Sequence, residues 1–196
     1  TGGGNLILGS ESFKNAELKG NTGDGSSITY ELTGGATMAN TNSNRYFRWT
    51  TVGAYVAKGV TLCLSVMYKP VSGADEFCME IAYMAGYSTS QSWATIKPTD
   101  QLEIEQTDGW VLRYGLWTPP DNATLKLVDM GSGTTHAGTG NYTNKFSLLH
   151  PMLQYGNAPT AWNASSGDYL TQESAKSLFS QTADEIKTEV TKSVTE

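Results

Sequence analysis

Residues 60–69 have the sequence Val-Thr-Leu-Cys-Leu-Ser-Val-Met-Tyr-Lys, in which every second side chain is apolar. The same alternation recurs in 76–84, Glu-Phe-Cys-Met-Glu-Ile-Ala-Tyr-Met, and in 110–117, Trp-Val-Leu-Arg-Tyr-Gly-Leu-Trp. Successive side chains of a strand point to opposite sides of a sheet, so a period of two predicts half-buried strands. In the third stretch this pattern places Trp110 on the inward, apolar face, and Arg113 and Trp117 on the more polar face.

Working outward from these stretches, the chain divides into short strands separated by turn-forming residues. The predicted strands are 5–9, 27–33, 45–51, 60–69, 76–84, 92–97, 101–106, 110–118, 124–130 and 145–155. Turn signals such as Gly34-Gly35, Asp108-Gly109 and Gly131-Ser132-Gly133 lie between them. Many short strands with regular turns are typical of a sandwich, so we predict an all-β jelly-roll β-sandwich over residues 1–162.

Charge and composition disfavour two classes of partner. The chain has 196 residues and a formal net charge of −6, and its 13 Lys and Arg residues are scattered along the sequence. A nucleic-acid-binding domain normally shows a basic stripe, so no nucleic-acid partner is expected. The same scattering disfavours binding to an anionic membrane surface. No run of 18 apolar residues occurs either, so no membrane insertion is expected.

The two cysteines, Cys63 and Cys78, lie on the predicted strands 60–69 and 76–84. If these strands pair as a hairpin with their apolar faces matched, the cysteines are offset by four residues, or roughly 13 Å. A disulfide needs Cα atoms within roughly 7 Å. We therefore predict two free thiols, buried as small apolar side chains.

The pattern changes after Trp162. Residues 163–170 form a polar linker, and 171–196 show a helical period. Apolar residues recur there at spacings of three or four, at Ala175, Phe179, Ala183, Ile186, Val190 and Val194. So narrow a stripe does not stabilise a lone helix in water. We predict that this C-terminal α-helix begins a stalk that forms a trimeric coiled coil. The alternative is a helix that packs back on its own sandwich.

Three stretches resemble one known family. Residues 5–13, Asn-Leu-Ile-Leu-Gly-Ser-Glu-Ser-Phe, resemble the first strand of the carbohydrate-binding-module-like jelly rolls of bacteriophage and prophage tail proteins. The segment Asp108-Gly109-Trp110, followed by a strand and Pro119, resembles a Gly-Trp, strand, Pro stretch of these modules. Residues 150–162, His-Pro-Met-Leu-Gln-Tyr-Gly-Asn-Ala-Pro-Thr-Ala-Trp, are similar to their closing strand, and the parts follow in the same order over residues 5–196.

The resemblance implies a function and a setting. It implies a homotrimeric receptor-binding or tail-tip component of a virion tail, in contact with other tail proteins, that binds glycans of the bacterial surface. It also implies structural roles for Trp110 and Trp162. Related modules often hold a structural calcium between a first-loop acid and a closing-strand Asp. Glu11 is present, but 145–155 contains no Asp or Glu, so no metal or other cofactor is expected.

Sugar binding by a sandwich needs flat aromatic faces and nearby side chains that bond hydroxyl groups. Three tryptophans remain after Trp110 and Trp162 are set aside. The predicted ligand-binding residues, in order of preference, are Trp93 with Tyr87, Trp117 with Arg113, and Trp49 with Arg48. Trp93 ranks first because it follows the polar loop 86–92. Packing in the core or at a sheet edge is the alternative for each ring.

Catalysis is not expected. Glu103 and Glu105 are two residues apart on a predicted strand and share one face, whereas a glycosidase needs carboxyl groups that face each other across a cleft. Neither His136 nor His150 has a Cys or acidic residue at metal-ligand spacing. The sequence therefore predicts a non-catalytic glycan-binding module. The alternatives are a structural spacer or assembly domain of the tail fibre and, less favoured, a polysaccharide depolymerase.

Overall fold

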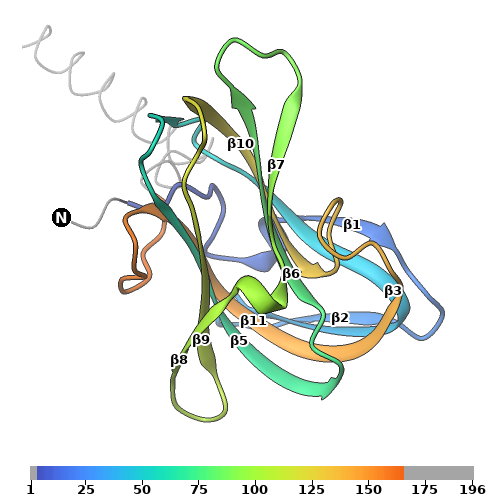
Figure 1. Ribbon diagram of the computed structural model, residues 1–196. Coiled ribbons are helices and arrows are strands. Elements are labelled where there is room, and N and C mark those ends of the chain that lie inside the picture. The colour runs from blue at the N-terminus through green and yellow to red at the C-terminus, as the bar shows by residue number, and fades with distance from the viewer. Residues whose placement is uncertain (1–3, 166–196) are drawn as a thin grey trace, which may run out of the picture. The chain divides into compact units, whose positions relative to one another are not determined.

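The computed structural model describes residues 4–165 of the chain (Figure 1). The strands are β1 (Glu17–Asn21), β2 (Ser27–Tyr30), β3 (Ala36–Thr50), β4 (Tyr55–Val56), β5 (Leu62–Gly73), β6 (Phe77–Ala85), β7 (Gln91–Ile96), β8 (Leu102–Glu105), β9 (Val111–Trp117), β10 (Ala123–Ser132) and β11 (Tyr142–Tyr155). Two short 3-10 helices, η1 (Phe13–Asn15) and η2 (Pro98–Asp100), complete the regular structure of this part. The all-β prediction is confirmed for it. The helix and stalk predicted for 171–196 lie outside the described residues.

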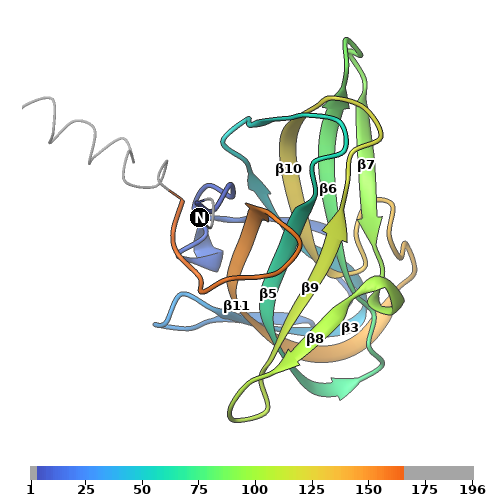
Figure 2. The ribbon, with the colours of Figure 1, turned by 60° about the vertical axis from the view of Figure 1, so that its left-hand side comes forward.

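The strands form two antiparallel layers that share β3. The first layer, called the β6 sheet, has the order β7-β6-β10-β3-β1, with β4 paired to the end of β10. The second layer, called the β5 sheet, has the order β8-β9-β5-β11-β3-β2. Figure 2 shows β11, β5, β9 and β8 side by side in one layer and β10, β6 and β7 in the other. No helix in the described part is long and apolar enough to cross a membrane.

Strand β3 passes from one layer to the other through a polar segment. Its first half pairs with β11 and its second half with β10, and Asn42 between the halves has a φ of 47°. The turn-like composition of this segment hid the first half of β3 from sequence analysis. Its polar side chains are nevertheless buried and bonded: Asn40 accepts from Arg45 Nε at 3.0 Å and donates to Asn144 at 2.9 Å. A buried polar group is tolerated when it is satisfied in this way.

The core lies between the inner faces of the two sheets. The alternating apolar side chains of β5 and β6 face this core, and Leu64 and Ile81 are fully buried there. The residues between them on β6, such as Glu80 and Ala82, are buried on the other face of the sheet. Phe13 from η1 contacts both Phe47 and Trp49, with ring centroids 4.9 Å apart in edge-to-face geometry. Full burial of one large apolar side chain is worth about 1.5–3 kcal/mol, so these rings contribute strongly to holding η1 on the sheet.

The hairpin predicted from 60–69 and 76–84 is wrong. Strand β5 pairs with β9 and β11, whereas β6 pairs with β7 and β10, so the two strands lie in different sheets. The prediction of two free, buried thiols is confirmed, but the cause is this separation into two layers. The alternation marked buried faces correctly without indicating which strands pair. Likewise, 5–9 forms only a single bridge, between Ile7 and Thr51.

The predicted faces of β9 are also reversed. Arg113 points inward and is 5% exposed, and Trp117 packs against Tyr83 with ring centroids 4.6 Å apart. Arg113 is buried at no loss of partners, because it donates to Asp75 and Glu103 at 2.6–3.1 Å and its guanidinium lies 4.0 Å from the Tyr68 ring centroid. Arg113 can therefore face inward, although the alternation of apolar residues predicted that it faces solvent, because its guanidinium has charged hydrogen-bond partners there.

Candidate ligand-binding groove

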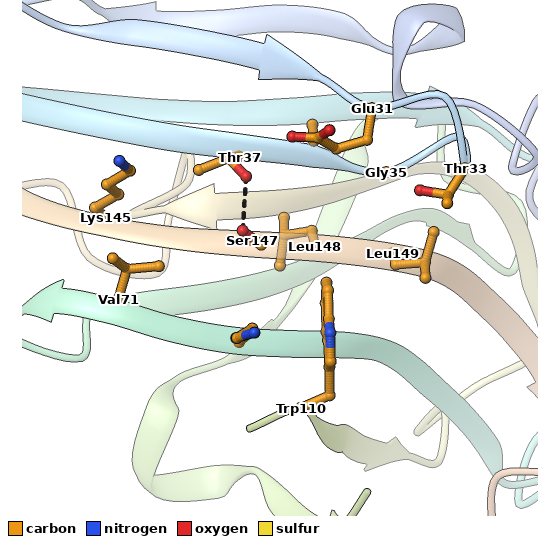
Figure 3. A pocket seen from close by; sticks show the side chains of 12 residues that line it. Glu31, Thr33, Gly35, Thr37, Val71, Trp110, Lys145, Ser147, Leu148 and Leu149 are labelled. Carbon is orange, nitrogen blue, oxygen red and sulfur yellow. Dashed lines mark hydrogen bonds between the residues drawn. The ribbon is translucent and has the colours of Figure 1, made fainter. Parts of the chain in front are cut away.

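A groove of about 340 Å³ lies on the outer face of the β5 sheet (Figure 3). It is lined by the turn between β2 and β3, by β5 and β11, and by Trp110 from the turn between β8 and β9. We call it the Trp110 groove. Its position follows from the phase of β9, because strand neighbours of inward-facing residues face outward.

A tight turn sets the position of Trp110. Asp108 and Gly109 both have positive φ, at 58° and 81°, and Trp110 N donates to Thr107 O at 3.2 Å. Two successive positive φ values are typical of the type I′ turn that joins hairpin strands, and Asp-Gly is a favoured sequence for it. The turn leaves Trp110 half-buried, and Figure 3 shows its ring standing beside Leu149.

The floor of the groove combines hydroxyl groups with apolar side chains. Thr37 and Ser147 are register partners, and their hydroxyl oxygens are 2.6 Å apart (Figure 3). Val71 and Leu149 supply apolar surface beside them. Each hydroxyl can donate one hydrogen bond and accept others, so this pair can bond a polar ligand. Lys69 Nζ lies 6.0 Å from the centroid of the Trp110 ring.

A second pocket of about 140 Å³ lies on the same sheet, and we call it the Trp162 pocket. Its lining includes Met67 of β5 and Met152 of β11, and one wall is the ring of Trp162. His150 stacks on that ring at 4.4 Å, with an angle of 12° between the planes. The pairing of β11 with β5 shifts register between Leu149 and Met152, which places His150 in a bulge with a φ of 58°. Burial lowers the pKa of His150.

The predicted site residues do not gather in one place. Trp49 is 2% exposed in the core, so neither face of its ring is open to a ligand. Trp117 and Arg113 point inward from β9, as described above. The side chain of Tyr87 is fully exposed between β6 and β7. Because of the core packing of Trp49 and Trp117 and the ion pairs of Arg113, these three are not assigned to the site proposed below.

Trp93 and Arg48 do come together, on the outer face of the β6 sheet. The Arg48 guanidinium lies 5.6 Å from the Trp93 ring centroid, and His136 packs on the same ring at 4.7 Å. Arg48 makes two bonds to Asp129, at 2.8 and 2.9 Å, and Asp129 is 0% exposed. Sequence analysis assigned Trp93 and Arg48 to separate pairs, because their strands are far apart in sequence.

Two carboxyl groups are buried beneath this face. Glu80 and Asp129 are register partners on β6 and β10, and both are fully buried. Burial raises the pKa of both, and for Asp129 it outweighs the opposing hydrogen bonds from Arg48. The backbone N–H of His136 donates to Glu80 Oε1, whereas Glu80 Oε2 has no hydrogen-bond partner among residues 4–165. The loop 133–138 closes over these groups through such bonds.

Glu103 of the Glu103–Glu105 pair is bonded to Arg113. Within residues 4–165, no three His, Cys, Asp or Glu side chains are grouped so that they could hold a metal ion.

Trp110, which the alternation placed inward, and the lysines near it were not among the predicted site residues. One signal for Trp110 was present in the sequence, because Asp108-Gly109 is a two-residue hairpin turn directly before it. The direction of Arg113 was the missing part: if Arg113 faces inward, Trp110 faces outward. Nothing in the sequence indicates that Lys69 and Lys145 line the same groove, since they belong to strands that pair only in the folded chain.

No family model and no curated protein matches the chain. Among solved structures, it is similar to the enzymatically active domain of tailspike protein 4 of bacteriophage CBA120, with 11% identity over 76% of this chain and a TM-score of 0.45. It is similar to the CBM22-1 and GH10 modules of xylanase 10B from Clostridium thermocellum, complexed with xylohexaose, with 16% identity over 83% of this chain and a TM-score of 0.44. The chain spans only 20% and 30% of those two proteins.

A third similar structure is the tripod from the baseplate of bacteriophage Tuc2009, with 13% identity, a TM-score of 0.41, and coverage of 85% of this chain and 60% of that one. Carbohydrate-binding modules and phage tail proteins, the two kinds of protein named by the sequence resemblance, are therefore both among the solved structures similar to this chain.

Proposed function

We propose that this chain is a non-catalytic glycan-binding module and that the Trp110 groove is its binding site. The observation that carries the proposal is the half-exposed Trp110 ring beside the bonded hydroxyls of Thr37 and Ser147. A sugar presents apolar C–H faces and a rim of hydroxyl groups. An aromatic ring next to hydroxyl donors and acceptors complements both. This mode of binding needs no cofactor.

The ligand we propose is an oligosaccharide rather than a single sugar. The Trp110 groove and the Trp162 pocket both lie over β5 and β11, and Lys69 of the groove and Ser65 of the pocket are four residues apart on β5. Four residues of strand span roughly 13 Å, which exceeds one sugar ring. A chain that follows the strands would contact both tryptophans.

The setting we propose is the tail of a phage or prophage particle, where the module binds a saccharide of the host surface beside other tail proteins. The sequence resemblance supports this setting. The apolar stripe of 171–196 supports a homotrimer, with residues 1–162 as the module and 163–170 as its linker. Three copies would raise a weak single-site affinity through effective concentration.

A glycan array probed with the full chain tests the function. The matched variants are Trp110→Ala in the groove and Trp93→Ala on the opposite sheet, with near-ultraviolet circular dichroism to confirm folding. We expect wild type and Trp93→Ala to bind the same saccharides, and Trp110→Ala to lose about tenfold or more in affinity. Loss through Trp93→Ala alone would place the site on the other face. An array without any bound saccharide would reject the function.

A second candidate, a spacer or assembly domain, is favoured by apolar side chains on the outer face of β8 and β9. Leu102, Ile104 and Leu116 are 52%, 43% and 42% exposed. Exposed apolar patches mark contact surfaces between proteins. If this role holds, Leu102→Lys/Ile104→Lys will disrupt the oligomer in sedimentation analysis. If the chain only binds glycans through the groove, that variant will keep both its oligomeric state and its saccharide binding.

A further inference from the structure

The Trp110 groove holds positive charge that makes no ion pair with the described residues. Lys69 and Lys145 both line it, and neither has a carboxylate oxygen within ion-pair distance among residues 4–165. The arginines of the same part are engaged: Arg48 binds Asp129, Arg113 binds Asp75 and Glu103, and Arg45 donates to Asn40 and backbone oxygens. Most lysines of this part make no ion pair, but Lys69 and Lys145 share one groove with an aromatic ring, within a chain of net charge −6.

Strand register places the two lysines on one surface. Lys69 of β5 lies opposite Ser147 of β11, and Lys145 lies two residues from Ser147 on the same side of β11, with buried Phe146 between them. Figure 3 shows Lys145 near Val71, away from Trp110. Lys69 lies at the tryptophan ring instead. The positive charge thus extends along the groove from the ring.

Glu31 is the one carboxylate among the groove residues, and it lies on the far side of the floor. Figure 3 shows it beside Thr37, across β11 from Val71. The backbone of Glu31 is part of the turn that follows β2, where Glu31 N donates to Gly35 O at 2.9 Å. The lysine side of the groove carries two ammonium groups, and neither makes an ion pair with a carboxylate of residues 4–165.

We propose that the groove selects an anionic saccharide, with Lys69 and Lys145 binding a carboxylate or phosphate substituent while the Trp110 ring covers the adjoining sugar. The inference rests on the glycan-binding function proposed above and names the chemical class of its ligand. A lysine ammonium is a compact charge with three donors, suited to either kind of anion. A hydrogen bond between charged groups is roughly twice as strong as a neutral one, so the anionic group would supply much of the selectivity.

The test uses the full chain and three sets of oligosaccharides: neutral, uronate-containing and phosphate-containing. The variants are Lys69→Gln/Lys145→Gln, and Lys58→Gln as a control, because Lys58 is exposed and lines none of the pockets described above. We expect wild type and Lys58→Gln to prefer an anionic set by about tenfold or more, and the double variant to lose that preference. Added salt should weaken only the anionic binding.

The outcomes separate the two proposals. A preference for uronates over sugar phosphates, or the reverse, identifies the anionic group. Equal binding of neutral and anionic saccharides by wild type, or a preference that survives in the double variant, overturns the charge selectivity and leaves glycan binding standing. Failure of all three sets to bind overturns glycan binding, and this inference with it.

Discussion

The outer faces of the two sheets differ in whether their charged side chains are paired. On the β6 sheet, Arg48 is bonded to the buried Asp129, and the loop 133–138 closes over Glu80. On the β5 sheet, Lys69 and Lys145 have no carboxylate partner among residues 4–165, and the ring of Trp110 is half-buried beside an open groove. A face whose charged groups are paired or buried has few of them left to bind a ligand. The face that does not is the one we assign to binding.

The largest effect should come from breaking the ion pair of the β6 face. Arg48→Met leaves the carboxylate of Asp129 buried without its partner, and we expect a loss of about 3–5 kcal/mol in the free energy of unfolding. Lys69→Met on the β5 face should change that free energy by no more than about 0.5 kcal/mol. Urea denaturation of both variants measures the contrast.

The control for this experiment is the double variant Arg48→Met/Asp129→Leu. Removing both charges avoids the unpaired carboxylate, so the double variant should recover much of the lost stability. If Arg48→Met costs less than about 1 kcal/mol, the pair behaves like one at the surface. The contrast between the two faces would then be much weaker than proposed.

Removing the Trp162 pocket should lower the affinity for saccharides by a smaller free energy, and the loss should depend on ligand length. Trp162→Ala removes one wall of the Trp162 pocket and leaves the Trp110 groove intact. We expect affinity for a long oligosaccharide to fall about tenfold, or about 1.4 kcal/mol, and affinity for a disaccharide to stay unchanged. Isothermal titration with the two ligand lengths provides the measurement. Equal losses for both lengths would show that the two pockets do not form one site.

The fold was predictable wherever apolar side chains alternate, as in β5 and β6. It was hidden where polar residues do the packing. In the first half of β3, Asn40 is buried because Asn144 and Arg45 satisfy it, and no apolar period marks such a strand. Pairing was also beyond the sequence, since two alternating strands joined by a turn fit equally well in one hairpin or in two layers.

The site was harder to predict than the fold, for a related reason. The alternation of β9 predicts that Arg113 faces outward, but its hydrogen bonds to Asp75 and Glu103 allow it to face inward. Because neighbouring side chains of a strand alternate, the same reversal places Trp110 on the outer face. Residue type alone did not distinguish Trp93, on which Arg48 and His136 pack from distant segments, from Trp110, which lines a groove. The neighbours of a ring in the folded chain, rather than its residue type, separate a platform from a packing residue.

The buried carboxyl group of Glu80 on the β6 face should make the stability of the protein depend on pH. Burial raises the pKa of Glu80 in the folded chain above the value of about 4.3 of an unfolded glutamate. Its contribution to stability is therefore complete below about pH 4.3 and is lost as the pH rises through the folded pKa. Glu80→Gln should match wild type at low pH and become the more stable protein as the pH rises.

Thermal unfolding over a pH series measures this difference, with Glu105→Gln, an exposed acid of the β5 sheet, as the matched control. This control removes an exposed carboxylate and leaves the buried ones in place. Because burial also raises the pKa of Asp129, some loss of stability with pH should remain in Glu80→Gln. A constant gap between wild type and Glu80→Gln would mean that the pKa of Glu80 is the same in the folded and the unfolded chain, so that burial does not raise it.

The smallest expected effect is on the reaction of the two thiols with a disulfide reagent, which should not occur in the native protein. Each sheet carries one of these thiols, so their reactivities compare the two sheets directly. Cys63 of β5 and Cys78 of β6 are both buried, and burial raises the pKa of each to about 12. Only the thiolate attacks a disulfide reagent, so neither should react in the native protein at mild pH, and both should react after unfolding. Cys78 also reports on the loop 133–138, since a Cβ added at Gly138 would lie 3.2 Å from its sulfur. Rapid native reaction of Cys78 alone would show that this loop opens, and that the β6 face is less closed than its hydrogen bonds indicate.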